Sequence, residues 1–244
     1  MNTPSPSELR LKSYYEKVYY SDVNKLQGKF FNRLHFYRLK KILAIHTPAP
    51  ADIVVDLGCA WGELCFALAG RCQKMIGVDF SEKVVKFCQT LLPEKLSTQL
   101  SFLCADAQCT GIKSNSIDVA ISADLFEHLY SDQFFRVLDE CRRILKTGGK
   151  LIVWTPHRGH VIERLKNNNI LLRRDPAHVD YKSMDMMKTH LRQRNFAILK
   201  NYYTESHIPI FNLLEKILFP IMPLFRRRIA ILAEKLPDKG KPCH

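Results

Sequence analysis

Short apolar runs alternate with amphipathic stretches along most of this chain, and the alternation predicts a sheet whose faces are covered by helices. The runs that indicate buried strands are 52–57, 74–79, 100–106, 117–122, 150–155, 195–203 and 228–235. The amphipathic stretches predict helices over 62–71, 82–92, 131–146 and near 183–194, and a mainly helical region over 8–46. Strands that alternate with helices favour a parallel sheet, so the pattern predicts an α/β fold.

Turn and cap residues mark where several of these elements begin and end. Ser81 precedes the helix predicted over 82–92 and is a suitable N-cap, because its hydroxyl can accept a hydrogen bond from the first helical turn. Gly148 and Gly149 follow the helix predicted over 131–146 and are interpreted as its C-terminal stop.

The most informative stretch joins the first predicted strand to the second. Gly58-Cys-Ala-Trp-Gly62 follows the first strand, and small residues in such a turn let the backbone approach a ligand at a helix N-terminus. The second strand ends at Asp79, whose carboxylate can accept both hydroxyls of a ribose. Gly58 and Asp79 are 21 positions apart, close to the spacing expected for a strand–turn–helix–strand unit that binds a nucleoside.

The same turn discriminates between nucleoside cofactors. A dinucleotide site requires G-x-G-x-x-G, and no third glycine follows Gly62 at that spacing. Asp56 stands just before the turn, where its carboxylate would repel a pyrophosphate and attract a cationic amino group. S-adenosylmethionine (SAM) carries a sulfonium and an α-amino group and no phosphate, so these residues favour SAM. The alternative is any other doubly wound α/β protein with a glycine-bearing turn.

At this point the chain resembles the class I SAM-dependent methyltransferases, in the branch whose first motif reads D-x-G-C-G-x-G. Asp56, Gly58 and Gly62 match that motif, and Ala60 stands where the family most often has glycine. The branch acts on small molecules and lipids and is similar to the ubiquinone-biosynthesis methyltransferases. The resemblance implies that these four positions bind SAM.

Two further segments extend the expected cofactor site. Phe80, directly after the ribose acid, matches the apolar residue that lies against the adenine in this family. Asp106 and Ala107 match the position whose acid meets the adenine amino group. Ser122 ends the fourth predicted strand and is expected to contact the same cofactor.

The resemblance also implies the architecture of the whole chain. It is carried further by Leu145-Lys-Thr-Gly-Gly149, which resembles an L-K-P-G-G turn, and by a last strand that resembles a terminal A-x-K strand. The implied fold is a doubly wound, Rossmann-like sheet of seven mostly parallel strands with the last strand antiparallel. A SAM-binding domain is expected over 51–244, after a helical substrate-side cap over 1–50. Within that domain we expect a substrate loop over 156–182 and an apolar insert over 208–227.

Methyl transfer from a sulfonium needs mainly proximity and alignment, and a hydroxyl acceptor is also helped by a general base. His128, which follows Glu127 at the mouth of the fourth predicted strand, is the candidate for that base or for steering the acceptor. The alternative is a histidine at a helix start that bonds to the backbone and shapes the loop. The ubiquinone-pathway enzymes show E-x-x-E-H here, which implies a divalent metal ion. Because this chain has the shorter Asp124 at the first position, no metal ligand is assigned.

Charge is distributed unevenly along the chain. The formal net charge is +13, made up of +6 in residues 1–50, −2 in 51–155 and +9 in 156–244. The expected cofactor core is thus nearly neutral between basic flanks. This favours an anionic acceptor or an acidic membrane surface, with a solvated basic surface as the alternative. Three histidines lie in the loop expected to roof the acceptor: His157, His160 and His178.

The cysteines and the first residues bear on the cell compartment. Residues 1–7 are rich in Pro and Ser and lack the pattern of a secretory signal. Seven cysteines are interpreted as reduced, buried thiols and not as a disulfide framework: Cys59, Cys65, Cys72, Cys88, Cys104, Cys109 and Cys141. We expect a cytoplasmic protein, with peripheral attachment to the cytoplasmic membrane face as a further hypothesis.

The connection between the last two strands, 208–227, is unusually apolar. Its longest uninterrupted apolar run, 217–225, has nine residues, whereas a membrane-spanning helix needs about 20. Arg226, Arg227 and Arg228 follow, so one hypothesis is an interfacial anchor on anionic lipid. A lid over a lipophilic acceptor and a helix packed on the sheet are the other two.

The leading hypothesis is a SAM-dependent methyltransferase that acts on a hydroxyl of a small or lipid-linked acceptor. A SAM-binding protein without transfer activity, serving as a partner or scaffold, is the alternative from a different class. A nucleic-acid or other N-methyltransferase comes third. Base-methylating enzymes typically carry Asp/Asn-Pro-Pro-Tyr/Phe after the fourth strand, where this chain reads Ser122-Ala-Asp-Leu125. No oligomeric state is assigned.

Overall fold

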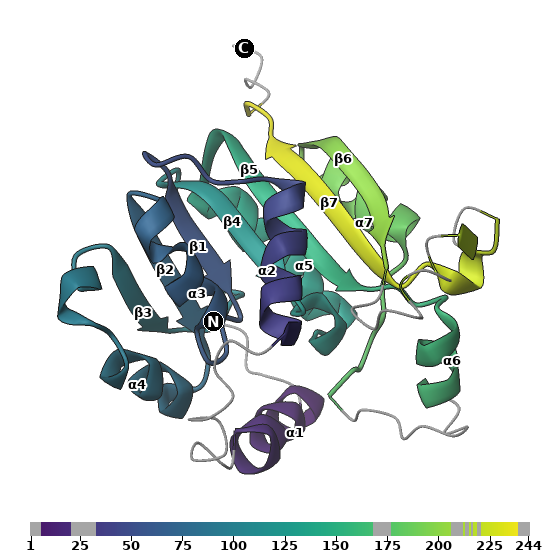
Figure 1. Cartoon of the computed structure of the whole chain (residues 1–244), viewed down its shortest axis with the longest axis horizontal. Coiled ribbons are helices and arrows are strands. Elements are labelled where there is room, and N and C mark those ends of the chain that lie inside the picture. Colours follow the sequence, from purple (N-terminus) through teal and green to yellow (C-terminus); the bar gives the residue numbers. More distant parts are fainter. Residues whose placement is uncertain are drawn as a thin grey trace, which may run out of the picture.

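Seven strands form one sheet in the order β3-β2-β1-β4-β5-β7-β6 (Figure 1). The computed structural model describes residues 6–20, 33–167, 177–205, 212, 215, 217–218 and 221–238. The strands are β1 Ile53–Leu57, β2 Lys74–Asp79, β3 Leu100–Cys104, β4 Ile117–Ala123, β5 Leu145–Pro156, β6 Phe196–Thr204 and β7 Arg228–Lys235.

The topology is doubly wound. Neighbouring strands from β3 to β5 run parallel, whereas β7 is antiparallel to both β5 and β6. β1 lies between β2 and β4, so the direction in which strands are added to the sheet reverses there. Ligands of open α/β sheets bind at such a switch point, beyond the carboxyl ends of the strands. The predicted seven-stranded sheet with an antiparallel last strand is confirmed.

Helices cover both faces of this sheet. They are α1 Pro6–Tyr14, α2 Arg33–Ile45, α3 Glu63–Leu68, α4 Glu82–Thr90, α5 Ser131–Ile144, α6 Val161–Asn167 and α7 Met184–Gln193. Shorter helical turns are η1 Tyr15–Tyr19, η3 Ala69–Arg71, η4 Glu94–Leu96, η5 Phe126–His128 and η6 Pro223–Phe225. Ser81 caps α4 as predicted, because its hydroxyl accepts a hydrogen bond from the Val84 amide.

The core is divided between the two faces by the alternation of side chains along each strand. Val54 of β1 belongs to the cluster that includes Ile42 of α2 and Leu64 of α3. The next residue, Val55, belongs to the opposite cluster, which includes Phe134 of α5. Central strands buried on both faces explain why the sequence shows continuous apolar runs there.

The helix predicted over 131–146 is two residues too long. α5 ends at Ile144, and Leu145 already pairs with Ile117 of β4. Gly148 and Gly149 therefore lie inside β5 and do not stop the helix. The pairing of β4 with β5 is irregular here, Gly148 adopts a φ of +79°, and a Cβ on Gly149 would lie 2.8 Å from the Lys146 carbonyl oxygen. Glycine is favoured at both positions, because a side chain would be strained at Gly148 and would clash at Gly149 in this irregular pairing.

Two other predictions need correction. The third strand ends at Cys104, because the chain then turns and Asp106 bridges Cys109. This turn leaves Cys104 and Cys109 exposed, so the interpretation of all seven thiols as buried is wrong for these two. The other five are buried, and all seven are free.

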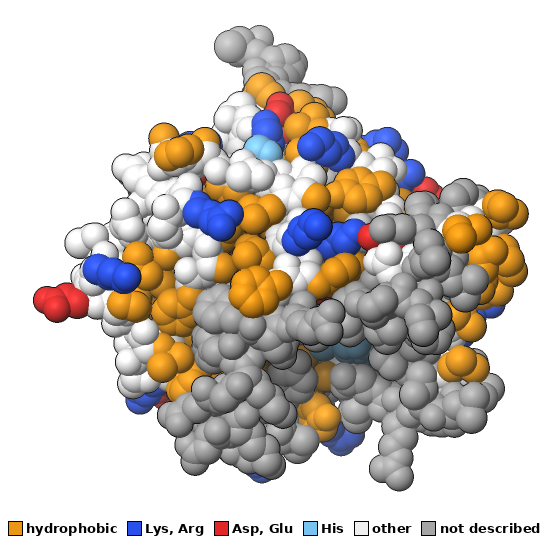
Figure 2. Space-filling view, viewed as in Figure 1, with side chains coloured by type: hydrophobic (Ala, Val, Ile, Leu, Met, Phe, Trp, Pro, Cys, Tyr) orange, Lys and Arg blue, Asp and Glu red, His pale blue; other side chains and the backbone are white. Residues whose placement is uncertain are grey.

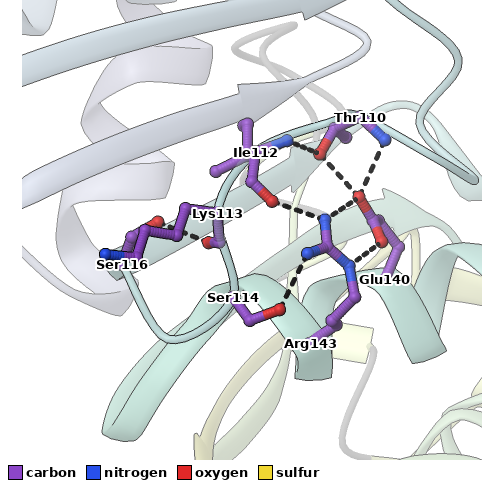
Figure 3. Close-up of polar contacts among 7 residues, drawn as sticks. All are labelled: Thr110, Ile112, Lys113, Ser114, Ser116, Glu140 and Arg143. Carbon is purple, nitrogen blue, oxygen red and sulfur yellow. Dashed lines mark hydrogen bonds and ion pairs between the residues drawn. The ribbon is translucent and has the colours of Figure 1, made fainter.

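The loop after Asp106 is fastened to α5 by a hydrogen-bonded network (Figure 3). The Glu140 carboxylate accepts from the Thr110 amide at 2.7 Å and the Thr110 hydroxyl at 2.6 Å. It also accepts from Arg143, whose guanidinium donates onward to Ser114 and to the Ile112 carbonyl. One buried carboxylate thus fixes the loop that follows Asp106, the acid expected to meet the adenine amino group.

Replacing Glu140 with alanine is expected to lower the free energy of unfolding by about 2–3 kcal/mol, because Thr110 would keep a buried amide and hydroxyl without an acceptor. Asp132→Ala is the matched control, because its ion pair with Arg136 on the same helix is exposed and worth less than about 1 kcal/mol. Chemical denaturation checks both variants. Equal midpoint shifts would contradict a special role for Glu140.

Candidate functional site

A cavity of about 110 Å³, partly open to solvent, lies at the switch point of the sheet. Its walls come from the turn after β1, the ends of β2 and β4, the turn after β3, and the N-terminal segment. Figure 1 shows α1 set beyond the carboxyl ends of the central strands. The site thus occupies the place that open α/β sheets offer to ligands.

The turn after β1 is built to bring backbone close to this cavity. Gly58 adopts a φ of +72° and donates its amide to the Val78 carbonyl at 2.8 Å. Gly62 adopts a φ of +75° at the start of α3, where a Cβ would lie 2.9 Å from the Phe102 ring. Ala60 also has a positive φ, of 45°, which is the conformation that explains the family preference for glycine.

Asp79 ends β2 with its carboxylate at the cavity wall. One oxygen accepts from the Ala60 amide and the other from the Ser81 amide, each at 3.0 Å. Burial raises its pKa to about 6, although these two hydrogen bonds oppose the shift. The turn and the acid are therefore held together by direct hydrogen bonds, in the arrangement that the sequence predicts for a ribose site.

Asp56 lies deeper, in β1, and does not line the cavity. It is 1% exposed, and its Oδ1 atom has no hydrogen-bond partner among the described residues. Burial raises its pKa to about 7, in spite of the nearby positive charge of Arg38. A buried carboxylate oxygen without a partner is costly, and a cationic amino group would satisfy it. These acceptor groups therefore fit the SAM that the sequence predicts.

Asp106 faces the cavity but is already engaged by the N-terminal helix. The Lys12 ammonium lies 2.7 Å from Oδ2, and the Gln108 amide donates to Oδ1 at 2.9 Å. Burial opposes ionisation, but these hydrogen bonds prevail and hold the pKa of Asp106 below its ordinary value. Lys12 also lies 5.6 Å above the ring of Phe80. An adenine placed here would meet Lys12, so α1 belongs to the site.

We expect the affinity for SAM to fall as the pH drops through 7 and then 6, where Asp56 and Asp79 take up protons. A bound cation lowers the pKa of Asp56, so binding should release protons, and affinity should change by up to about tenfold per pH unit. Calorimetry near pH 6.5 in two buffers of different ionisation enthalpy measures this release. A dissociation constant that stays constant from about pH 5.5 to 8 would contradict it.

His128 lines the opposite part of the cavity, on η5 after β4. Its Nδ1 atom lies 2.9 Å from the Ala177 carbonyl oxygen, and its ring packs edge-on against Tyr15 at 5.6 Å. A carbonyl oxygen can only accept, so Nδ1 carries the proton and the neutral ring holds its lone pair at Nε2. This is the tautomer a general base needs if Nε2 is the accepting atom.

Glu127 is not brought to the cavity. It is 1% exposed, and its carboxylate accepts from the Thr155 hydroxyl at 2.9 Å. Burial, with repulsion from Asp124, raises the pKa of Glu127 well above its usual range. A carboxyl group buried behind the cavity does not face the acceptor, so this placement does not support the predicted catalytic role of Glu127.

The cation hypothesis for Asp124, Glu127 and His128 also loses support. Asp124 forms ion pairs with Arg228 and Arg38, which satisfy its charge. Glu127, His128 and His178 do place one potential ligand atom each within 4.8 Å of one another. However, each of the three is already hydrogen-bonded, to Thr155, Ala177 and Tyr181 respectively. The contacts that the structure shows for these three residues are therefore hydrogen bonds.

The predicted site residues divide into two groups. Those that line the cavity are Gly58, Ala60, Asp79, Phe80, Asp106, Ala107 and His128. Those that lie behind it are Asp56, Gly62, Ser122 and Glu127. Ser122 is buried in β4, and its hydroxyl has no hydrogen-bond partner among the described residues.

Sequence reasoning predicted a helical cap over 1–50 but assigned no site residue within it. Leu11, Lys12, Tyr15 and Tyr20 line the cavity, and the rings of Tyr15 and Tyr20 pack at 5.7 Å. The sequence feature that indicates this wall is the cluster of four tyrosines between positions 14 and 20, because so many aromatic side chains close together favour packing against an apolar surface. Of the loop histidines, His178 packs on His128, His157 packs on Tyr203, and His160 is buried beside Glu215.

Comparison with known proteins agrees with this geometry. A family model described as a methyltransferase domain matches residues 55–153, from β1 to β5. That span includes the glycine turn, Asp79, Asp106 and His128.

Two curated relatives match the chain over part of its length. The ubiquinone biosynthesis O-methyltransferase of Coxiella burnetii is 30% identical over 105 residues, which is 43% of this chain and 44% of that protein. The demethylmenaquinone methyltransferase of Oceanobacillus iheyensis is 24% identical over 157 residues, 62% of this chain and 64% of that protein. Less than half of the Coxiella protein is therefore matched.

A solved structure matches nearly the whole chain. The methyltransferase complex with the Trm112 activator from Haloferax volcanii superposes with a TM-score of 0.69 and 17% identity, covering 95% of this chain and 100% of that one. At that identity the likeness shows the shared fold alone.

Proposed function

We propose that this chain is a class I SAM-dependent methyltransferase that transfers a methyl group from SAM to a hydroxyl of a small or lipid-linked acceptor, as the matched methyltransferase domain and the curated relatives support. The observation that carries the choice of a hydroxyl is His128, whose Nδ1 is bound by a carbonyl so that Nε2 can take a proton. The O-methyltransferase of Coxiella burnetii supports the same choice by analogy.

Residues that line the cavity, and Asp56 behind it, have roles in this proposal. SAM supplies a methyl group on a positively charged sulfur, which leaves as a neutral thioether. Asp79 would accept hydrogen bonds from the ribose, Asp56 would attract the amino group from behind the cavity, and Phe80 would cover the adenine. His128 accepts the proton of the acceptor hydroxyl at Nε2, so that the oxygen can form its bond to the methyl carbon. Tyr15 and Tyr20 exclude water from the space between them and the turn.

Incubation with methyl-labelled SAM and a cell lipid extract tests the proposal. Label in the organic phase is expected. Calorimetric binding of SAM without label in any fraction would instead support a SAM-binding protein without transfer activity. Label that stays with nucleic acid in a parallel incubation would move the acceptor to the third hypothesis.

The insert between β6 and β7 is the part of the chain that we propose contacts a lipid surface. Most of 208–220 lies outside the described residues, so the three readings of the segment rest on the remainder. Ile217, Ile221 and Met222 are 60%, 78% and 41% exposed, and apolar side chains gather at that edge of the molecule (Figure 2). No helix among the described residues is long and apolar enough to cross a membrane.

The three arginines that follow the apolar run 217–225 contact other parts of the protein, whereas the sequence hypothesis placed them on anionic lipid. Arg226 lies over the Tyr203 ring and Arg228 over the Trp154 ring, at 5.0 and 4.0 Å from the ring centres. Arg227 is half-buried, 3.9 Å from the Glu215 carboxylate. Guanidinium groups engaged in this way are held against the body, so the lipid contact that we propose is mainly apolar.

Ile221→Glu is expected to weaken co-sedimentation with phosphatidylcholine vesicles by roughly tenfold, since one buried isoleucine contributes about 1.5–3 kcal/mol. Salt should have little effect on the wild type. The matched control is Leu199→Glu, which changes an exposed apolar residue of β6. If the wild type stays in the supernatant with both neutral and anionic vesicles, only the lid and packed-helix readings remain.

A further inference from the structure

We propose that residues 177–182 form a clamp that holds His128 in its proton-accepting tautomer, with His178 as the positioning residue. The inference rests on the proposed function, because it assigns His128 the role of general base. The clamp comes from a segment about 50 positions further along the chain, after α6 and before α7.

The segment docks along its length on the residues around His128. The Val179 and Asp180 amides both donate to the Glu127 carbonyl, at 3.0 and 3.3 Å. The Ser131 hydroxyl donates to the Asp180 carboxylate at 2.9 Å. Lys182, 1% exposed, donates to Asp180 and to the Leu129 carbonyl, so a buried ammonium links the segment to the loop after η5.

This docking sets the position of the Ala177 carbonyl, which determines the tautomer of His128. The carbonyl accepts the Nδ1 proton at 2.9 Å. If the carbonyl moved away, the proton could sit on either ring nitrogen, and the fraction of rings with a lone pair at Nε2 would fall. A base that must be fixed by a second group is the common arrangement in enzymes.

A second chain of hydrogen bonds orders His178. The Tyr181 hydroxyl donates to the Glu163 carboxylate at 2.7 Å, and a hydroxyl has one proton to give. The Tyr181 oxygen must therefore accept at 2.6 Å from Nδ1–H of His178. Tyr181 and Glu163 are 7% and 5% exposed, and hydrogen bonds are strengthened where water is excluded.

The two histidines meet ring to ring. Their centres are 4.7 Å apart at an angle of 60°, and the His128 ring also packs on Tyr15. His128 is thus in contact with both an ordered imidazole and a buried phenol, and these contacts restrict rotation of its ring. The contacts from Glu163 to Tyr181, to His178 and to His128 therefore connect α6 to the cavity and hold each of these side chains in one position.

Tyr181→Phe tests the clamp, because it removes the hydroxyl and keeps the ring. We expect ¹⁵N NMR of the unliganded protein to show both tautomers of His178 and a mixed or broadened signal for His128. The rate of label transfer from SAM to the lipid extract should fall roughly tenfold, while the SAM dissociation constant stays the same. Tyr202→Phe, which removes a phenol hydroxyl on β6, is the matched control and should leave all three unchanged.

Glu163 provides a second pair of variants that does not depend on Tyr181 folding correctly. Glu163→Gln keeps an oxygen that accepts from Tyr181 and should behave like the wild type, whereas Glu163→Met should reproduce Tyr181→Phe. Unchanged His128 signals and unchanged rates in Tyr181→Phe and Glu163→Met would overturn the clamp. The NMR readout needs no turnover, so a wild type that transfers no label would refute the proposed function and leave the clamp to be decided by the spectra.

Discussion

Replacing His128 with alanine is expected to lower the rate of methyl transfer by about 100- to 10,000-fold, the range for loss of a general base. The affinity for SAM should change little, because Asp79 and its turn are positioned by the Ala60 and Ser81 amides and not by His128. The physical reason for the loss is that the acceptor hydroxyl would have no group positioned to take its proton as the new bond forms.

Initial rates of label transfer from methyl-labelled SAM to the lipid extract, with calorimetry for SAM binding, separate these two effects. His46→Ala is the matched control, because His46 lines a separate cavity, near the first residues of β4 and β5. A variant that transfers label at the wild-type rate near neutral pH would assign His128 to loop structure, the alternative reading of this histidine.

Replacing Asp79 with alanine is expected to weaken SAM binding at least tenfold. The carboxylate would accept two ribose hydroxyls, and charge-assisted hydrogen bonds contribute about 1.5–3 kcal/mol each. The substitution also frees the Ala60 and Ser81 amides, so the turn itself should loosen. Both consequences act in the same direction on affinity.

Calorimetry on the folded variant measures the change, and circular dichroism verifies the fold. Asp79→Asn keeps one acceptor oxygen and should lose less affinity than Asp79→Ala. Asp139→Ala, an exposed carboxylate on α5 that pairs with Arg194, controls for the loss of a negative charge. Unchanged affinity in Asp79→Ala would remove Asp79 from the cofactor site and with it the main argument for the ribose position.

The cofactor half of the site could be predicted because its parts are local in sequence. Gly58, Ala60 and Asp79 stand where apolar strands end, and parallel strands bring their carboxyl ends to one edge of the sheet. Both the turn and the acid therefore reach the cavity as the pattern predicts. The pattern could not tell that Asp56 lies behind the cavity, since depth along a strand depends on how the sheet packs.

Element borders were predicted less well where two signals compete. The double glycine at 148–149 is typical of a helix end, yet it serves an irregular pairing of β4 with β5. The local sequence shows that glycine is favoured here but not why. The reason is the pairing with β4, a strand about 30 residues earlier in the chain.

The sequence by itself determined the order of the strands and of most helices, the glycine turn with its ribose acid, and the resemblance to a methyltransferase family, because each depends on residues a few positions apart. The tertiary structure alone decided three things: that Lys12 engages Asp106, that Arg38 and Arg228 engage Asp124, and that residues 177–182 hold His128. Each of these joins segments separated by between 49 and 104 positions. Hydrogen bonds and ion pairs act over a few ångströms, so their partners are set only once packing has brought such segments together.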